Sequence, residues 1–254
     1  MPPKKPANQQ VPPAKVNDFM NVSGCVDKKL AEKLLLKNNL DVNNAVEEFF
    51  NGNFAETHGS KPNVDPKLLE AEFLKYNDGN DKMEQNGVVK FFEAASLEME
   101  DVIVFIFSYE CKAQLMGEFK KEEWIRGMTS LGVTSAQEFG QKANEFRARY
   151  KASSPAFNEL FKFVFTFFNG GKKSIPGEEA AMLLGMVARG KYPLTDGMVN
   201  FLTKDPMASK EPIYKDTWNM IHHLLKTTKE NGEGFSTEDA WPLLIINFME
   251  AIQN

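Results

Sequence analysis

Apolar residues recur three or four positions apart in segment after segment of this chain, and this pattern limits the folds it can adopt. Such spacing places the apolar side chains on one face of a helix. Several segments begin just after an aspartate, a residue that caps helix N-termini; Asp27, Asp41 and Asp65 are examples. We therefore predict an all-α protein.

Three short helices are predicted for residues 16–54. An apolar stripe comes first, and a helix from Lys28 to Lys37 follows Asp27. A last helix follows Asp41 and stops at Asn51-Gly52. About 40 residues are enough for a small core of this kind. The pattern indicates a compact three-helix module.

The segments on either side of this module have a different composition. Residues 1–15 contain five prolines and no aromatic residue, which predicts a disordered tail. Residues 55–64 gather Gly, Ser, Pro and Asn, as linkers do. A larger helical domain is predicted for residues 65–252.

One stretch of the larger domain is ambiguous. Between Phe157 and Phe168, phenylalanines alternate as they would in a strand, but they also fit a helical face. The surrounding segments have helical spacing, and no partner strand is evident. We interpret the stretch as a buried helix.

Composition argues against several classes of partner. The net charge is −5 and the basic residues are scattered, whereas nucleic-acid-binding proteins concentrate them on one face. No apolar run is long enough to span a membrane, and the polar N-terminus is not a signal peptide. The two distant cysteines favour a reducing compartment. We expect no nucleic-acid or membrane partner, and a location in the nucleus and cytoplasm.

The run from Asn77 to Asp81 suggests an EF-hand loop, because acidic and amide side chains follow one another between two predicted helices. Starting at Asp78, however, the fifth position is Lys82 and the twelfth is Val89, where calcium needs an oxygen ligand and a glutamate. The sequence therefore favours degenerate EF-hand-like helix pairs that bind no metal.

We find no arrangement of residues typical of an enzyme. Nucleophile elbows, phosphate-binding loops and paired Cys/His motifs are absent from the sequence. Cys111 follows Val104 and Phe107 on an apolar helical stripe, where a cysteine is usually inert. We predict a binding module without catalytic residues, metal or cofactor.

Three motifs, in matching order and spacing, carry a resemblance to a known family. They are the run Gly117–Gly132, the run Lys215–Asn219 and the run Asp239–Ile245. Together with the N-terminal module they resemble the DCN-like family, the "defective in cullin neddylation" proteins, over roughly residues 16–252. The resemblance implies a ubiquitin-associated (UBA)-like module followed by a PONY domain. It also implies a scaffold-type co-ligase that brings a cullin and its RING subunit together with the conjugating enzyme of the ubiquitin-like modifier Nedd.

Two binding surfaces are implied by this resemblance. The first is an apolar pocket for the N-terminally acetylated methionine of the conjugating enzyme. Its implied lining is Val88, Val104, Phe107, Ser108, Cys111, Gly117, Phe119 and Phe165. Acetylation removes the charge of the terminus, so a dry apolar pocket should favour the acetylated form.

The second surface is a patch for the C-terminal domain of the cullin, and it maps to Asp216, Ala240, Ile246 and Asn247. Here the chain departs from the family pattern, because no carboxylate stands at Ile246-Asn247. The acidic residues between positions 230 and 254 could still attract a basic partner.

Two alternative functions remain open at this point. The UBA-like module implies ubiquitin as a further partner, although Ser23-Gly24-Cys25 replaces the usual Met-Gly-Phe loop. The chain could then be a ubiquitin-binding adaptor without neddylation activity. The other alternative is an EF-hand-type calcium-binding protein.

Overall fold

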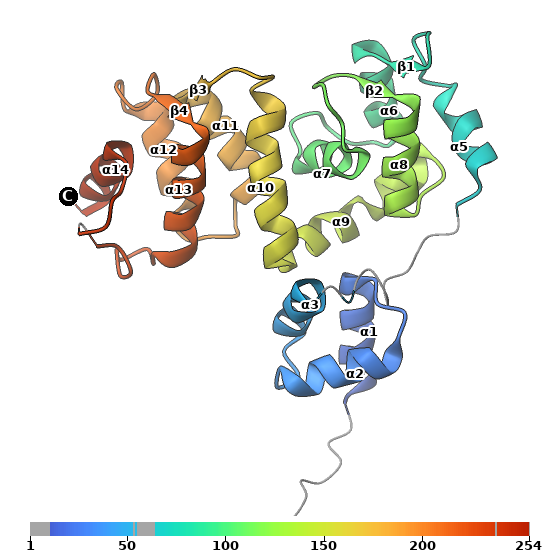
Figure 1. The fold of residues 1–254 in the computed structure, drawn as a ribbon, viewed down its shortest axis with the longest axis horizontal. Helices are drawn as coiled ribbons and strands as arrows, with labels where there is room; N and C mark the ends of the chain where they lie inside the picture. Colours follow the sequence, from blue (N-terminus) through green and yellow to red (C-terminus); the bar gives the residue numbers. More distant parts are fainter. Residues whose placement is uncertain (1–10, 53, 55–63, 237, 254) are drawn as a thin grey trace, which may run out of the picture.

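The computed structural model describes residues 11–52, 54, 64–236 and 238–253, and within them it contains thirteen helices and four very short strands. Figure 1 shows a small helical module below a larger body made of two helical lobes. The all-α prediction is confirmed. None of the helices in the described part of the chain is long and apolar enough to cross a membrane.

The small module consists of α1 (Pro13–Ser23), α2 (Lys28–Lys37) and α3 (Val42–Asn51). The carboxylate of Asp27 accepts hydrogen bonds from the first turn of α2, and that of Asp41 does the same for α3. Helix α1 begins at Pro13, so residues 13–15, which were expected to belong to a disordered tail, are helical. A proline at this position fits the first turn of a helix. Residues 1–10 and most of the expected linker lie outside the described residues.

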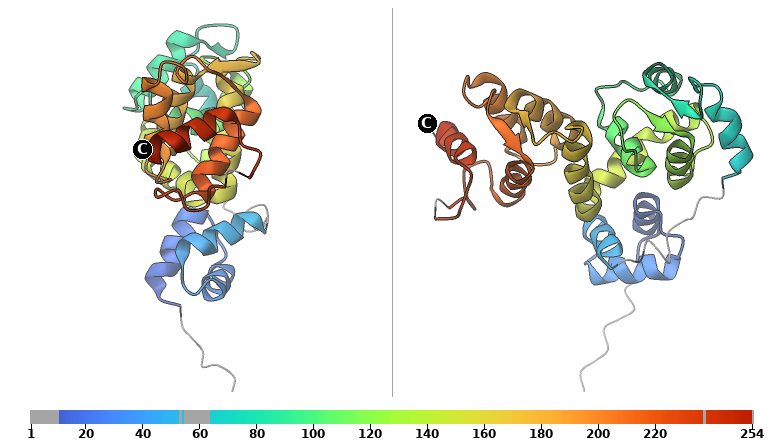
Figure 2. Two further views of the ribbon diagram at one scale, coloured as in Figure 1. Left: turned by 90° about the vertical axis from the view of Figure 1, so that its left-hand side faces the viewer. Right: turned by 45° about the horizontal axis from the view of Figure 1, so that its top comes forward.

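The module is packed against the larger body. Helix α1 contacts α9 (Ala136–Ala152), and α3 contacts both α9 and α10 (Ser154–Phe168). Both views in Figure 2 agree with this placement. One face of α3 is therefore covered by the junction of α9 and α10.

The first lobe contains two helix pairs. They are formed by α5 (Pro66–Phe73) with α6 (Gln85–Ala94), and by α7 (Val102–Cys111) with α8 (Lys121–Leu131). The loops of the two pairs meet in a short antiparallel contact between β1 (Lys82–Met83) and β2 (Phe119–Lys120). This is the EF-hand-like arrangement that the sequence predicts.

Aromatic rings fill the core of this lobe. The ring of Phe91 lies 5.1 Å from that of Phe107, 5.6 Å from that of Trp124 and 5.7 Å from that of Phe139. The buried carboxylate of Glu72, on α5, accepts a hydrogen bond at 2.9 Å from the amide of Ala136, the first residue of α9. Glu72 thus helps to cap the N-terminus of α9. These contacts hold α9 against the lobe.

The second lobe repeats the pattern. Its helices are α10, α11 (Gly177–Ala188), α12 (Thr195–Lys204) and α13 (Lys215–Thr227). Strands β3 (Ser174–Pro176) and β4 (Pro212–Tyr214) pair antiparallel, as β1 and β2 do.

The phenylalanine-rich stretch is helical, as interpreted from the sequence. It forms α10 because its phenylalanine rings pack against neighbouring helices on two sides of the helix. On the side of α13, the Phe161 ring stacks 4.4 Å from the Trp218 ring. A possible cap at Thr237 predicts a last helix from there to Ile252, but the last helix, α14, spans Leu243–Gln253 and so begins later than expected. Pro242 directly precedes it, and a proline is tolerated at the start of a helix but not in its interior.

The loop between α5 and α6 uses its polar side chains to hold the backbone. The Asp78 carboxylate accepts hydrogen bonds from the amides of Glu84 and Gly87, each at 2.9 Å. Lys82 forms an ion pair with Glu118 at 2.9 Å. Within the described residues, no group of three or more His, Cys, Asp or Glu side chains is placed to hold a metal ion.

Candidate functional site

An apolar cavity of about 580 Å³ lies where the two lobes meet. Helices α6 and α7 and the turn before β2 contribute from the first lobe, and α10 and α11 from the second. The lining residues are Gln85, Val88, Val89, Met99, Glu100, Val104, Phe105, Ser108, Met116, Gly117, Phe119, Phe167, Phe168, Met182 and Met186. A mainly apolar wall with a few polar groups is typical of a ligand-binding pocket.

Five residues that the family resemblance placed in the pocket do line this cavity: Val88, Val104, Ser108, Gly117 and Phe119. Val104 and Ser108 lie one turn apart on the same face of α7. Gly117 has a φ of +79°, which favours glycine at the turn that leads into β2. Ser108 is only 1% exposed and adds a hydroxyl group to the wall.

The other three predicted residues do not line the cavity. The Phe107 ring packs 5.3 Å from the Phe119 ring inside the core, because Phe107 is rotated about 60° around α7 from Val104. Cys111 is fully buried further along α7, against Gly127 of α8. Phe165 is 1% exposed, and its ring faces that of Trp218 instead.

Cys111 has no access to a substrate. A Cβ atom built on Gly127 would lie 2.3 Å from its sulfur, so α8 presses directly on the thiol. Burial raises the pKa of Cys111 well above its usual range, and the nearby Glu110 carboxylate adds to this effect. The thiol is therefore neutral and packed.

Sequence reasoning missed the methionines of the wall. Met99, Met116 and Met182 are 37%, 55% and 48% exposed, so much apolar surface faces solvent at this cavity. Methionine is flexible and adapts to the shape of a ligand. Met186 also lines the cavity. Met182 and Met186 are four positions apart, which puts both on the same face of α11, and this spacing is the one signal for them in the sequence.

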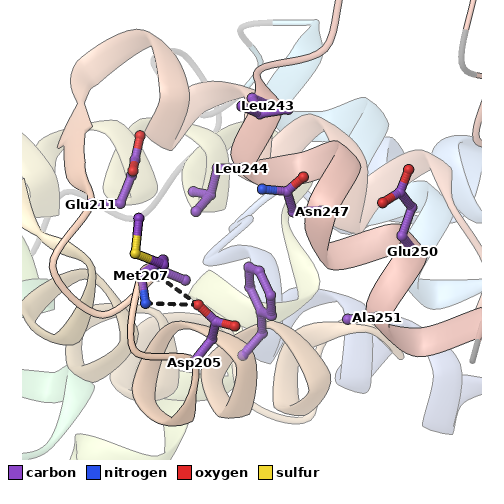
Figure 3. Close-up of a pocket in the computed structure, with 10 residues that line it drawn as sticks. Asp205, Met207, Glu211, Leu243, Leu244, Asn247, Glu250 and Ala251 are labelled. Atoms are coloured by element: carbon purple, nitrogen blue, oxygen red, sulfur yellow. Dashed lines mark hydrogen bonds between the residues drawn. The ribbon is translucent and has the colours of Figure 1, made fainter.

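A second hollow, of about 400 Å³, lies at the C-terminal end of the second lobe, between α14 and the turn that follows α12. Figure 3 shows Asp205 and Glu211 on one side, and Asn247 and Glu250 on α14. The Asp205 carboxylate accepts hydrogen bonds from the amides of Met207 and Ala208, at 2.9 and 2.8 Å, and so shapes the turn.

The four residues predicted to meet the cullin all lie in this C-terminal region. Asp216 is exposed in the first turn of α13, and Ala240 is exposed in the loop before α14. Asn247 lines the second hollow, whereas Ile246 is half-buried and packs against the main core. Where a carboxylate was expected from the family pattern, the chain has a core-packing side chain.

The loop that carries Ala240 is held by Trp241. Its indole N–H donates to the Ser236 carbonyl oxygen at 3.0 Å, and its ring stacks on that of His223 at 5.5 Å. Asp239 and Ala240 are thus presented to solvent from an anchored loop.

On the UBA-like module, the turn between α1 and α2 is exposed to solvent. Val26 in this turn is 61% exposed, and Cys25 beside it is buried. Helix α3 is less accessible, because it packs on α9 and α10.

Comparison with known proteins agrees with this architecture. Residues 14–56 match the UBA-like domain family, and residues 138–251 match the cullin-binding family. The human protein "DCN1-like protein 5" is 25% identical over 181 residues, which cover 71% of this chain and 75% of that protein. "Defective in cullin neddylation protein 1" of Caenorhabditis elegans is 23% identical over 249 residues, covering 89% of this chain and 84% of that protein.

The chain joins a UBA-like domain to a cullin-binding domain, and the proteins it matches are named as DCN1-like or as defective in cullin neddylation. The resemblance recognised in the sequence is therefore confirmed, including its two-part organisation. Within this chain, the apolar cavity uses both lobes, and the second hollow falls inside the region that matches the cullin-binding family.

Proposed function

We propose that this DCN-like protein acts in cullin neddylation as a non-catalytic scaffold. It binds the acetylated N-terminus of the conjugating enzyme in the cavity between the lobes, and the C-terminal domain of the cullin at the α13–α14 end. The chemistry belongs to the conjugating enzyme and to the RING subunit of the cullin. The gain in rate comes from holding the reactants close together in a suitable orientation.

The apolar cavity between the lobes is the observation that carries this proposal. Its volume of about 580 Å³ suits a few side chains of an extended or helical peptide. The walls offer no buried carboxylate to a terminal ammonium group, since Glu100 at the rim is exposed. Burying an unpaired charge is costly, so acetylation of the N-terminus should strengthen binding.

Fluorescence anisotropy with a peptide from the N-terminus of the conjugating enzyme tests this proposal. We expect the acetylated peptide to bind at least tenfold more tightly than the free amine, a difference of about 1.4 kcal/mol. Val104→Arg, which fills the cavity with a charged side chain, should abolish binding. Leu68→Arg is the matched control, because Leu68 is an exposed apolar residue on α5 outside the cavity. Equal binding of the two peptides would argue against this use of the cavity.

A reconstituted neddylation reaction tests the scaffold itself. With the native cullin, RING subunit and conjugating enzyme, the chain should raise the initial rate of modification. Asp216→Lys should reduce this stimulation without changing peptide affinity, because Asp216 is exposed on α13 and does not line the cavity. If the rate is the same with and without the wild-type chain, the scaffold proposal fails.

Ubiquitin binding by the N-terminal module is the second candidate. Val26 and Leu36 supply exposed apolar surface on this module, at 61% and 42%. The packing of α3 on α9 and α10 counts against it, because the last helix is one of the elements such modules commonly use. If neither peptide binds the cavity, the ubiquitin-adaptor function becomes the better explanation.

A further inference from the structure

A smaller cavity, of about 260 Å³, lies between the last turns of α9 and α11. Apolar side chains of α7, α10 and α11 form much of its wall, among them Ile106, Leu160 and Val187. Two arginines and two lysines complete the wall. Apart from Met186, none of the lining residues is shared with the larger apolar cavity, so we treat this as a site of its own.

The two arginines are compensated by the chain itself. The guanidinium group of Arg147 donates to both carboxylate oxygens of Asp101, at 3.0 and 2.7 Å. Arg189 pairs with Asp196 at 3.2 Å. The excess positive charge of the wall therefore comes from its two lysines.

These lysines are Lys151 on α9 and Lys191 just after α11, and each extends toward the backbone that carries the other. The Lys191 ammonium group donates a hydrogen bond to the Lys151 carbonyl oxygen at 2.5 Å and lies 4.6 Å from the centre of the Phe157 ring. A Cβ atom built on Gly190 would lie 3.3 Å from the Lys151 ammonium nitrogen. Both positive charges are thus held between the ends of α9 and α11. Among the described residues, neither lysine forms an ion pair with a carboxylate.

The half-buried Lys191 is affected by this crowding. Burial, and then the positive charge of Lys151, lower the pKa of Lys191, while Glu47 of α3 acts in the opposite direction. Two like charges held close together repel, and an anion bound between them would stabilise the charged form of both. A wall with uncompensated positive charge beside apolar side chains therefore favours a ligand that has an anionic group and an apolar body.

We propose that this cavity binds a small carboxylate with an apolar body. The two lysine ammonium groups each donate to one carboxylate oxygen, and the body lies against Ile106, Leu160 and Val187. Hydrogen bonds between charged groups are about twice as strong as those between neutral ones. The volume limits the ligand to a small one, because pockets for drug-sized ligands usually have about 300–1,000 Å³. This inference does not depend on the proposed function.

Chemical-shift titrations of the isotope-labelled full chain test the proposal with three probes. Phenylpropionate carries the carboxylate on an apolar ring, phenylpropanamide is its neutral counterpart, and inorganic phosphate is an anion without an apolar body. We expect phenylpropionate to shift the amide signals of Gly190 and Lys191. The neutral amide should bind at least about fivefold more weakly, because it cannot pair with the ammonium groups. Phosphate should also bind more weakly, because it leaves the apolar wall uncovered.

A neutral variant of one lysine locates the carboxylate. Lys151→Gln removes the charge but keeps the backbone carbonyl that holds Lys191, so it should lower the affinity for phenylpropionate to about that for the amide. The affinity for the amide itself should not change. Lys162→Gln is the matched control, since Lys162 is an exposed lysine on α10 that does not line the cavity, and it should bind both probes as the wild-type chain does.

A blocking variant separates the two cavities. Ala148 lines the small cavity from an exposed position on α9, so Ala148→Trp should block binding there without disturbing the core. If this variant binds phenylpropionate as well as the wild-type chain does, the probe occupies another site and the inference is wrong. It is also wrong if the amide or phosphate binds as tightly as phenylpropionate. If no probe shifts the signals of Gly190 and Lys191, the lysines serve only to satisfy the helix ends, and the inference fails.

Discussion

Replacing Gly177 with alanine should lower the free energy of unfolding by about 3 kcal/mol, at the upper end of the usual cost of overpacking. Gly177 opens α11, and a Cβ atom placed on it would lie 1.9 Å from the carbonyl oxygen of Ala208. That oxygen has little room to move, because the neighbouring Ser209 carbonyl accepts a hydrogen bond from the Glu178 amide at 2.9 Å. Urea denaturation at neutral pH measures the change.

Gly185 provides the matched control within the same helix. A Cβ atom there would come no closer than 3.5 Å to any neighbour, the nearest being the side chain of Arg189. Gly185→Ala should therefore be neutral or stabilise the protein by up to about 1 kcal/mol, the usual gain from replacing a helical glycine. Equal stabilities of the two variants would show that the Ala208 carbonyl yields at low cost.

The same close contact affects function. Ala208 lines the hollow beside α14 and belongs to the turn after α12. Figure 3 shows its neighbour Met207 on the side of the hollow that faces α14. A shift of this turn in Gly177→Ala should weaken the cullin binding proposed for this end of the chain, and it should affect the peptide binding proposed for the cavity between the lobes less.

Lowering the pH from 6.5 to about 4 should cost about 3 kcal/mol of stability through His222 alone. Burial lowers the pKa of His222 to about 4, and the nearby charges of Lys226, Lys191 and Lys162 contribute. Its ring stacks 4.2 Å from that of Phe161, and its Nε2 is hydrogen-bonded to the Tyr192 hydroxyl at 3.1 Å. The unfolded chain binds a proton below pH 6.5, whereas the folded chain resists it, so stability falls as the pH falls.

Two histidine variants isolate this effect. His222→Gln removes the titrating group, so the loss of stability between pH 6.5 and 5 should shrink, even if the variant is less stable at pH 7. His223→Gln changes the adjacent, exposed histidine, which is only the last of the causes that lower the His222 pKa, so this variant should keep most of the wild-type slope. Urea denaturation at pH 7, 6 and 5 compares the three proteins. An unchanged slope in His222→Gln would contradict the assignment.

Much of the local structure could be predicted because its causes are local. Asp27, Asp41 and Asp65 each accept hydrogen bonds from the first turn of the helix that follows, as their places in the sequence predict. Apolar spacing predicted α10 even though its phenylalanines also alternate as in a strand. The start of α14 was predicted too early, because a cap signal was favoured over the effect of Pro242.

The binding site was harder to predict, because it depends on how helices are rotated. Phe165 and Phe167 are two positions apart on α10 and equally apolar, but only Phe167 lines the cavity. Phe107 and Ser108 are neighbours on α7, and the polar one faces the cavity. Hydrophobicity identifies both phenylalanines of the first pair as buried and cannot tell core from wall, and it gives no sign that Ser108 is buried at all.

The sequence by itself determined that the chain is helical, that a small module precedes a larger domain, and which family it resembles. Capping, periodicity and motif order are properties of short segments, so they can be recognised without tertiary contacts. Only the tertiary structure decided which side chains meet across the two lobes. It brought methionines of α11 opposite α7, placed α3 against α9 and α10, and brought the Lys191 ammonium group to the Lys151 carbonyl oxygen. These residues are far apart in the chain and become neighbours only when the helices pack.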